Sequence, residues 1–293
     1  MTEFKKMHPI VNFLFFLFAI GFAMVFTHPL CLALSFLSAV FSRHFAVGKP
    51  KAKSVIYTAI LFISASLITP LFSHEGVTIL TYLPSGNPLT AESILYGISA
   101  AFMLITVLIW FSSFNTVMTS DKIVYLAGRL APSLSLVFSM CLRFVPRFVS
   151  QIKKIALARK TYGKGSPQRL TERIKDALAV LSVAISISLE GSIETADSMK
   201  CRGYGLSHRT AYTNYRISSR DVFWIFWILC FSAYIIIGKI LGQINFAYYP
   251  YIKSAPMNFY TASVFLSYFL LNAAPVIIEI KEAQRWKALK SKI

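Results

Sequence analysis

Apolar residues are grouped along this chain in runs long enough to form helices across a membrane. The runs cover residues 10–26, 30–41, 55–72, 94–111, 222–241 and 259–280. A helix rises 1.5 Å per residue and needs about 20 apolar residues to cross the hydrocarbon core of a bilayer, and most of these runs approach that length. The pattern predicts an all-α, polytopic membrane protein with about six transmembrane helices.

Run 30–41 is the exception, because it is short for a perpendicular crossing. It could instead be a core helix, a re-entrant segment or half of a tight helical hairpin. Segment 73–91 contains no Lys or Arg, which predicts that it lies outside the cell.

The middle of the chain has a different pattern, in which long amphipathic helices carry many Arg and Lys residues. We therefore divide the chain into N-terminal transmembrane helices (1–119), long cytoplasmic helices (120–220) and C-terminal transmembrane helices with a basic tail (221–293). The first long helix has an apolar row that Arg159 extends: Val137, Cys141, Phe144, Phe148, Ile152 and Ile155. The second has an apolar row of Ile174, Leu178, Leu181, Ile185, Leu189 and Ile193, beside a polar row that includes Glu190, Glu194 and Asp197. These acids favour a solvated or salt-bridged face over a metal site.

Both long helices end in a similar basic segment. The first ends in Ala158-Arg159-Lys160, shortly before Gly163, and the second ends in Cys201-Arg202-Gly203, where glycine is expected to stop the helix. A single arginine at a helix C-terminus has a structural explanation, because it is favoured by the helix dipole and can bond the last carbonyl groups. The occurrence of two such ends in one region favours a shared binding role.

The composition agrees with membrane insertion. Apolar residues make up 56% of the chain and the mean hydropathy is +0.60, whereas roughly 45–50% apolar residues are usual in soluble domains. The 25 Phe and 14 Tyr suit lipid-facing packing and interfacial belts. The cysteines, at positions 31, 141, 201 and 230, form no CxxC pair, so neither a zinc site nor a disulfide framework is predicted.

The net charge of +18 comes from 30 Lys and Arg residues against 12 Asp and Glu residues. If the N-terminus is inside and the chain crosses six times, every Lys and Arg except Lys239 and Lys253 falls on the cytoplasmic side. This distribution predicts cytoplasmic N- and C-termini. No nucleic-acid-binding module accompanies the charge, so we expect contact with anionic membrane lipid and not with nucleic acid.

No catalytic residue and no metal site is predicted, because the chain has no Gly-rich Walker loop, no GxSxG and no HExxH. One enzyme class stays open as an alternative. A polytopic membrane enzyme acting on a phosphorylated lipid could bind phosphate through cytoplasmic Arg and Lys residues. Its acid-base candidates would be His8, His208, Glu190 and Glu194.

The motifs resemble those of the transmembrane T component of energy-coupling factor (ECF) transporters, and the resemblance covers most of the chain. Segment 142–148 (LRFVPRF) is similar to the family's Arg-Phe/Ile-Pro segment, and Met7-His8-Pro9-Ile10 to the short motif before its first span. Residues 158–160 and 201–203 fall where the family has two Ala-Arg-Gly signatures. Lys160 replaces the first glycine and Cys201 replaces the second alanine.

The resemblance implies an energy-coupling subunit of a bacterial or archaeal cell-membrane importer of vitamins or metal ions. Its expected partners are two ABC-type ATPase subunits and a substrate-binding membrane S component. The chain itself would be no enzyme and would hold no cofactor, since ATP would be bound by the ATPases. The long helices would be coupling helices, whose ATPase-contacting residues are Ala158, Arg159, Lys160, Cys201, Arg202 and Gly203. Their interface with the substrate-binding protein would contain Phe144, Phe148, Ile152, Leu181, Ile185 and Leu189.

Overall fold

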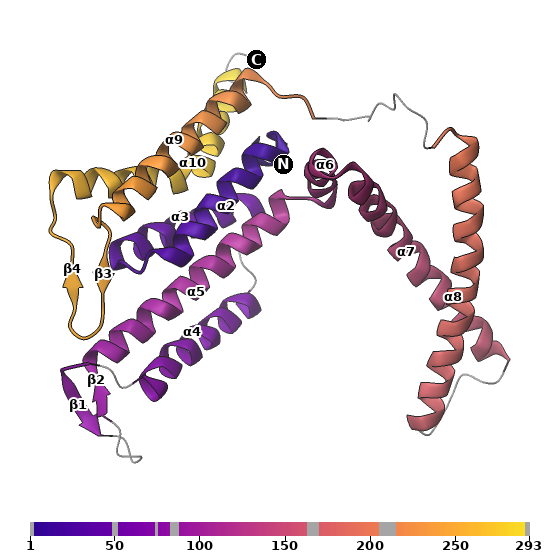
Figure 1. Cartoon of the computed structure of the whole chain (residues 1–293), viewed down its shortest axis with the longest axis horizontal. Helices are drawn as coiled ribbons and strands as arrows, with labels where there is room; N and C mark the ends of the chain where they lie inside the picture. Colours follow the sequence, from indigo (N-terminus) through magenta and orange to yellow (C-terminus); the bar gives the residue numbers. More distant parts are fainter. Residues whose placement is uncertain are drawn as a thin grey trace. The chain divides into compact units, whose positions relative to one another are not determined.

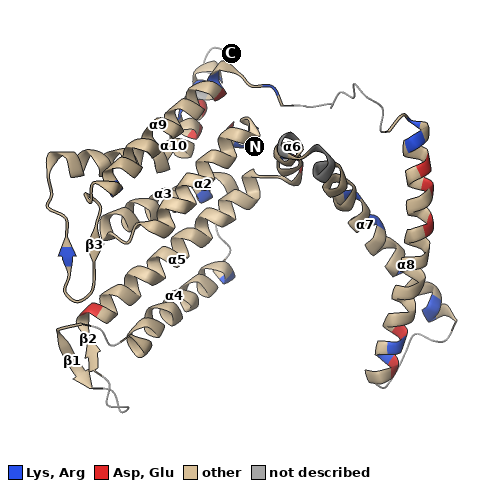
Figure 2. Ribbon diagram, in the orientation of Figure 1, with Lys and Arg blue, Asp and Glu red and all other residues tan. Residues whose placement is uncertain are grey.

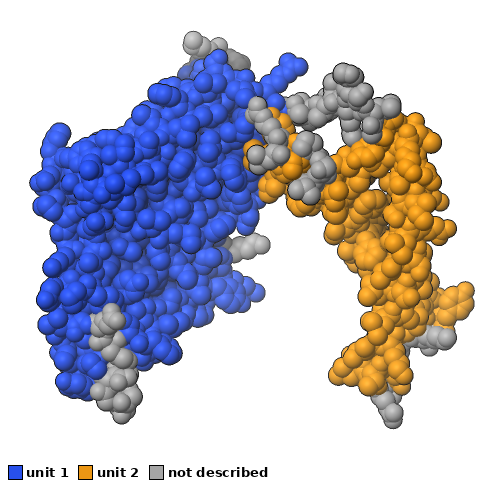
Figure 3. Space-filling view, in the orientation of Figure 1, with its two compact units in different colours: residues 1–119, 215–293 blue, residues 120–214 orange. Residues whose placement is uncertain are grey.

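The chain folds into two compact units, which Figures 1 and 3 show in a computed structural model. The structure describes residues 3–48, 52–73, 76–82, 88–162, 170–204 and 215–290. Unit 1 is formed by residues 1–119 and 215–293, and unit 2 by residues 120–214. The first and last parts of the chain therefore pack together, and the middle part forms a unit of its own.

Unit 1 is built mainly from helices. They are α1 (Glu3–Lys6), α2 (Pro9–Val25), α3 (Pro29–Val47), α4 (Ala52–Phe72), α5 (Ala91–Val117), α9 (Ser219–Ile240) and α10 (Phe259–Lys290). Two short antiparallel hairpins pair β1 (Ile79–Tyr82) with β2 (Pro88–Thr90), and β3 (Phe246–Ala247) with β4 (Lys253–Ser254). Unit 2 contains α6 (Ser120–Leu130), α7 (Pro132–Thr161) and α8 (Leu170–Cys201).

The prediction of an all-α polytopic membrane protein is confirmed. Among the described residues, six helices are long and apolar enough to cross a bilayer, namely α3, α4, α5, α8, α9 and α10. The sequence pattern also gave six crossings, but the two sets differ. The pattern counted run 10–26, which is now α2 and has 17 residues, and it did not count α8.

Helix α3 is longer than the apolar run that predicted it. The run ends at residue 41, whereas α3 continues through Ser42, Arg43 and His44 to Val47 and has 19 residues. A long arginine side chain can lie along apolar surface while its charged end reaches the polar edge, so Arg43 does not stop the helix. Helix α10 likewise continues through the basic tail to Lys290.

The core of unit 1 lies around α5, which packs against α2, α3 and α4. Trp110 of α5 is fully buried, and its ring makes edge contacts with Phe15 and Phe16 of α2. The Trp110 Nε1–H also donates a hydrogen bond of 3.2 Å to Ser35 Oγ of α3. This cluster joins α2, α3 and α5 to one another.

The N-terminal segment is fixed to the beginning of α9. His8 caps α2, because its Nδ1 accepts from the Ile10 N–H, and its own backbone N–H donates to Asp221 Oδ1 at 3.4 Å. Asp221 and Ser218 form a reciprocal capping box at the start of α9. Glu3 lies 4.0 Å from Arg220. These contacts hold the chain terminus beside the point where the chain returns to unit 1.

The connections at the opposite end of unit 1 are also tied together. The Tyr248 hydroxyl, next to the β3–β4 hairpin, donates to the Thr27 carbonyl at 3.0 Å and lies 2.6 Å from Ser99 Oγ. Tyr249 is hydrogen-bonded to Ser73 at 3.3 Å. Successive long helices of unit 1 therefore run between two ends, one with these turns and one with the chain termini.

Candidate functional site

Helices α7 and α8 of unit 2 carry the two basic segments, and they pack against each other where they cross in Figure 1. Arg159 of α7 contacts Asp176 of α8, whereas Leu136 and Met140 of α7 share a groove with Met199. Residues near the C-terminus of α7 therefore contact residues near the N-terminus of α8, and residues near the N-terminus of α7 lie beside the C-terminal part of α8. The two helices are antiparallel, so their C-termini lie at opposite ends of the pair.

The side of α8 that faces α7 consists mostly of small residues. Ala184 is fully buried, and Ser188, Gly191 and Thr195 are half-buried, each three or four positions after the one before. Small side chains at this spacing allow the backbones of two helices to approach closely. This stripe, and not the row of large apolar residues, faces α7; it is fully buried at Ala184, and the space beside Gly191 is open.

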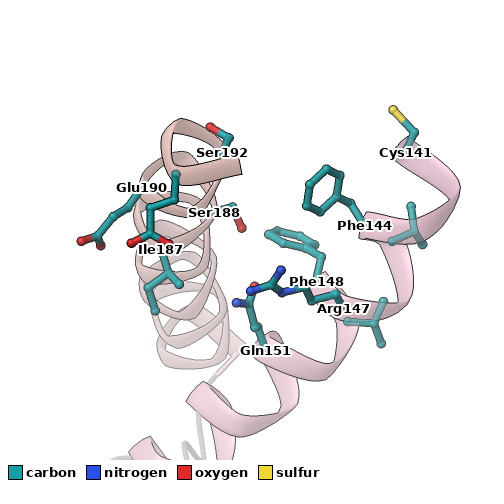
Figure 4. Close-up of a pocket in the computed structure, with 13 residues that line it drawn as sticks. Cys141, Phe144, Arg147, Phe148, Gln151, Ile187, Ser188, Glu190 and Ser192 are labelled. Carbon is teal, nitrogen blue, oxygen red and sulfur yellow. The ribbon is translucent and has the colours of Figure 1, made fainter. Parts of the chain in front are cut away.

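The facing side of α7 is larger and partly aromatic. Phe148 and Ile152 are half-buried, while Phe144 is 37% exposed. A groove of about 530 Å³ lies between these residues and α8, and Figure 4 shows Phe144, Phe148 and Arg147 directed into it from α7. Ser188 and Glu190 line it from α8. The lining from α7 is mainly apolar but includes Arg147 and Gln151, and the lining from α8 combines small and polar residues with Ile187.

Arg159 lies in the last turn of α7, as the sequence predicted, but its side chain is not free. One terminal nitrogen donates to Asp176 Oδ1 of α8, and the two side chains are 29% and 23% exposed. The Arg159 Nε is buried without a hydrogen-bond partner among the described residues. Ala158 and Lys160 beside it are exposed. The arginine is thus held in place and still presents donors at the surface.

Arg202 directly follows the last residue of α8, and the helix ends there as predicted. Gly203 adopts a φ of 79°, a left-handed conformation that glycine reaches without a steric penalty. The Gly203 N–H donates to the Lys200 carbonyl, and the Tyr204 N–H donates to the Met199 carbonyl. This pair of bonds is the Schellman arrangement, which fixes the backbone at Arg202.

The side chain of Arg202 is exposed and lines a second groove between the two helices. The groove has a volume of about 460 Å³, and Arg143 and Arg147 of α7 line it together with Glu194 of α8. Three arginines and one glutamate therefore line the same groove. Such a site has an excess of positive charge and suits an acidic group on a partner.

The predicted interface residues of α8 lie on another face of that helix. Leu181, Ile185 and Leu189 are 42%, 46% and 61% exposed. At 3.6 residues per turn, this row lies roughly a quarter of a turn from the small-residue stripe. Helix α8 thus has one face against α7, one exposed apolar face and one polar face, and Figure 2 shows the acidic residues along its length.

Sequence reasoning missed the residues that accompany the two arginines. Asp176 was not expected to pair with Arg159, and Arg143 and Arg147 were not expected to lie near Arg202. An antiparallel pairing of the two helices, had it been assumed, places Arg159 opposite Asp176. The short link between the helices, residues 162–169, was the available signal.

The residues named for a lipid-modifying enzyme are divided between the two units in the part that the structure describes. His8 is buried in unit 1, where its ring nitrogen caps α2. Glu190 and Glu194 are exposed residues of α8 in unit 2. His208 lies outside the described residues.

Comparisons with known proteins place this arrangement in a family. Residues 2–212 match the family of CbiQ, described as cobalt transport protein. Over 111 residues the chain is 29% identical to the energy-coupling factor transporter transmembrane protein EcfT of Staphylococcus aureus (strain 04-02981), covering 37% of this chain and 41% of that protein. Over 207 residues it is 25% identical to the EcfT of Bacillus selenitireducens (strain ATCC 700615 / DSM 15326 / MLS10), covering 65% of this chain and 75% of that protein.

Proposed function

The chain belongs to the CbiQ family and is an energy-coupling membrane component of the ECF type, and on this premise we propose its place in an importer. It transmits ATP-driven motion of two ATPase subunits to a substrate-binding membrane subunit. The cargo is a vitamin or a metal ion. ATP is bound and hydrolysed by the partner subunits, and this chain holds no cofactor.

The observation that carries the proposal is the separation of the two arginines on the α7–α8 pair. Arg159 is held at Asp176, near the start of α8, whereas Arg202 lies at its end. The stretch of α8 from Asp176 to Arg202 is about 40 Å long at 1.5 Å per residue. Two cations this far apart fit two separate protein surfaces better than one groove. We assign one ATPase subunit to each arginine.

The chemistry of Arg159 fits a contact shared between Asp176 and an ATPase. A guanidinium has five N–H donors in a planar fork, and Asp176 takes one of them. The other terminal N–H groups can bind a carboxylate or carbonyl group of the ATPase without breaking the internal pair. Asp176 thus keeps the arginine oriented before and after docking.

Arg202 presents its charge in a different way. Its backbone is fixed by the turn at Gly203, and its side chain is exposed beside Arg143 and Arg147. This local excess of positive charge attracts an acidic groove and speeds the encounter with it. The second ATPase therefore meets a cationic cluster, and the first meets a single arginine already oriented by an acid.

The exposed apolar face of α8 supports the second half of the proposal. Leu181, Ile185 and Leu189 form a continuous row of large side chains that nothing in unit 2 covers among the described residues. Exposed apolar patches of this kind mark contacts with protein or membrane. The substrate-binding subunit is a membrane protein in this proposal, so it can cover the row, together with Phe144, Phe148 and Ile152 of α7.

The charges of unit 1 support a proposed orientation in the membrane. The chain termini, Lys5, Lys6 and the basic end of α10 lie at one end of the unit, and Lys239 and Lys253 lie toward the other. Lys and Arg are retained on the cytoplasmic side of membrane proteins. We therefore place both termini, and the ATPases that contact unit 2, in the cytoplasm of a bacterial or archaeal cell.

Replacement of either arginine tests the proposal. We expect Arg159→Ala and Arg202→Ala each to weaken attachment of an ATPase by about 2–5 kcal/mol, because a charged partner in the interface is left unpaired. Co-purification of the ATPases and uptake into proteoliposomes measure the effect. Lys154→Ala, which removes an exposed charge of α7, is the matched control and should leave both unchanged.

Wild-type uptake by both arginine variants, with both ATPases attached, would contradict the docking role. A lone purified chain that turns over a phosphorylated lipid would instead support the enzyme alternative. The two results are separable, since the first requires partners and the second does not.

A further inference from the structure

A further groove lies in unit 1, beside α5. Helices α3 and α4 both pack against α5, and a space of about 510 Å³ is left between them. Phe36 and Val40 line it from α3, Ala59 and Phe62 from α4, and Phe102 and neighbouring residues of α5 close its base. Almost all of its lining is aliphatic or aromatic.

The groove has the length of one leaflet of a bilayer. Its lining on α3 extends from Phe36 to Gly48, which is about 18 Å at 1.5 Å per residue. Half of the hydrocarbon core of a bilayer is about 15 Å thick. Both α3 and α4 have the length and composition of membrane-crossing helices, and the lining residues Val40, Val55 and Ile63 are exposed.

One end of the groove is cationic. Arg43 and His44 line it there, close to the connection between α3 and α4. One terminal nitrogen of Arg43 donates to Ser54 Oγ of α4 at 3.4 Å. The Arg43 Nε is buried and has no hydrogen-bond partner among the residues that the structure describes. A buried donor without a partner is costly, and an anionic oxygen would satisfy it.

We propose that this groove binds one anionic phospholipid, with its phosphodiester headgroup at Arg43 and His44 and an acyl chain along Phe36, Phe62 and Phe102. The assignment rests on three features together: an apolar groove, a length of one leaflet and a cation only at the end where a headgroup lies. Basic pockets between transmembrane helices bind anionic headgroups in this way. The site is independent of the docking surfaces of α7 and α8.

The test counts lipids on the purified full-length chain by native mass spectrometry. Phosphatidylglycerol and phosphatidylcholine with identical acyl chains are supplied in turn. We expect the wild-type chain to retain one more phosphatidylglycerol than phosphatidylcholine. Arg43→Gln should lower the affinity of that lipid about fivefold, which corresponds to the loss of one cation near a lipid surface. Arg43→Lys, which keeps the positive charge, should retain most of the affinity for phosphatidylglycerol.

A second variant tests the apolar part of the groove. Ala59→Trp fills the groove and should remove the bound lipid, whereas Ile60→Trp, at an exposed position outside it, should not. Circular dichroism confirms that each variant is folded. Equal retention of both lipids by the wild-type chain, or unchanged phosphatidylglycerol in both Arg43→Gln and Ala59→Trp, would overturn the proposal. Loss of the substrate-binding subunit from Ala59→Trp with lipid unchanged would also overturn it, because the occupant would then be that protein.

Discussion

Helices α5 and α8 have similar lengths and are both apolar, yet they bury very different shares of their surface. A third of the most apolar window of α5 is buried inside its unit, against 6% for α8. Helix α5 contacts neighbours on several sides and carries Trp110 at the centre of the core. Among the residues of α8, only Ala184 is buried.

The two units reach stability in different ways. Unit 1 has a core of its own, and lipid can cover the apolar surface that this core leaves exposed. Helix α4 has the same buried share as α8, but α8 also carries a polar row with Glu190, Glu194 and Asp197, which a bilayer interior would penalise. Helix α8 therefore needs one apolar and one polar neighbour, which an assembly of subunits provides.

The largest expected effect lies in the core of unit 1. Trp110→Ala should destabilise the chain by about 3–5 kcal/mol, because it leaves a cavity and removes the partner of the buried Ser35 hydroxyl. The melting temperature of the chain in detergent measures this. Trp286→Ala, at a position 56% exposed on α10, is the control and should change stability by about 0.5 kcal/mol or less. Equal shifts would mean that the aromatic cluster is not the core.

A charge on the exposed face of α8 should break assembly and not folding. Ile185→Asp is expected to lower capture of the substrate-binding subunit at least about tenfold, since an unpaired carboxylate would be buried in the interface. Ser186→Asp, on the neighbouring polar row, should have little effect. A pull-down with the ATPases present measures how much substrate-binding subunit each variant captures. If the two variants behave alike, this face of α8 is not an interface.

A matched pair of glycine substitutions sharpens the contrast between the units. An alanine Cβ at Gly97 of α5 would lie 2.6 Å from the Ser66 carbonyl oxygen of α4, so Gly97→Ala should cost about 1–3 kcal/mol. A Cβ at Gly191 of α8 meets nothing within 4 Å, so Gly191→Ala should stabilise the helix by up to about 1 kcal/mol. Thermal melting distinguishes the signs. A loss at both sites would show that α7 and α8 pack more tightly than we describe.

The smallest effect concerns the pair between Arg159 and Asp176. Both side chains are partly exposed, so Asp176→Asn should cost about 0.2–1 kcal/mol of stability. Because Asp176 orients Arg159, we expect a weaker attachment of one ATPase, but a smaller loss than for Arg159→Ala. Asp197→Asn removes an exposed pair with Lys200 and serves as the control. A loss as large as that of Arg159→Ala would give Asp176 a direct contact of its own.

Much of the fold could be predicted from periodicity. Runs of apolar residues gave the helices of unit 1, and glycine after Arg202 gave the end of α8, because both signals act locally along the chain. The length of α3 was missed, since the apolar run that predicted it ends at residue 41, before Arg43. A long side chain that reaches the polar edge leaves no mark in such a pattern.

The pairing of side chains across helices could not be predicted in the same way. The row of large residues on α8 was the natural candidate for packing, but the structure uses the small residues around Ala184 to contact α7. Asp176 is one acid among several basic neighbours, and only the antiparallel arrangement brings it to Arg159. The predicted contacts of Arg159 and Arg202 with ATPases remain predictions.

Site-specific cross-linking tests the central claim most directly. Cys201 lies exposed beside Arg202, and Ala158→Cys adds a second thiol beside Arg159, in a chain whose exposed Cys141 and Cys230 are replaced by serine. Each thiol is coupled to a short photoactivatable cross-linker within the assembled transporter. We predict products in which one chain is joined to two ATPase subunits, one through each position. Attachment of both positions to a single ATPase subunit, or of neither to any, would contradict the account.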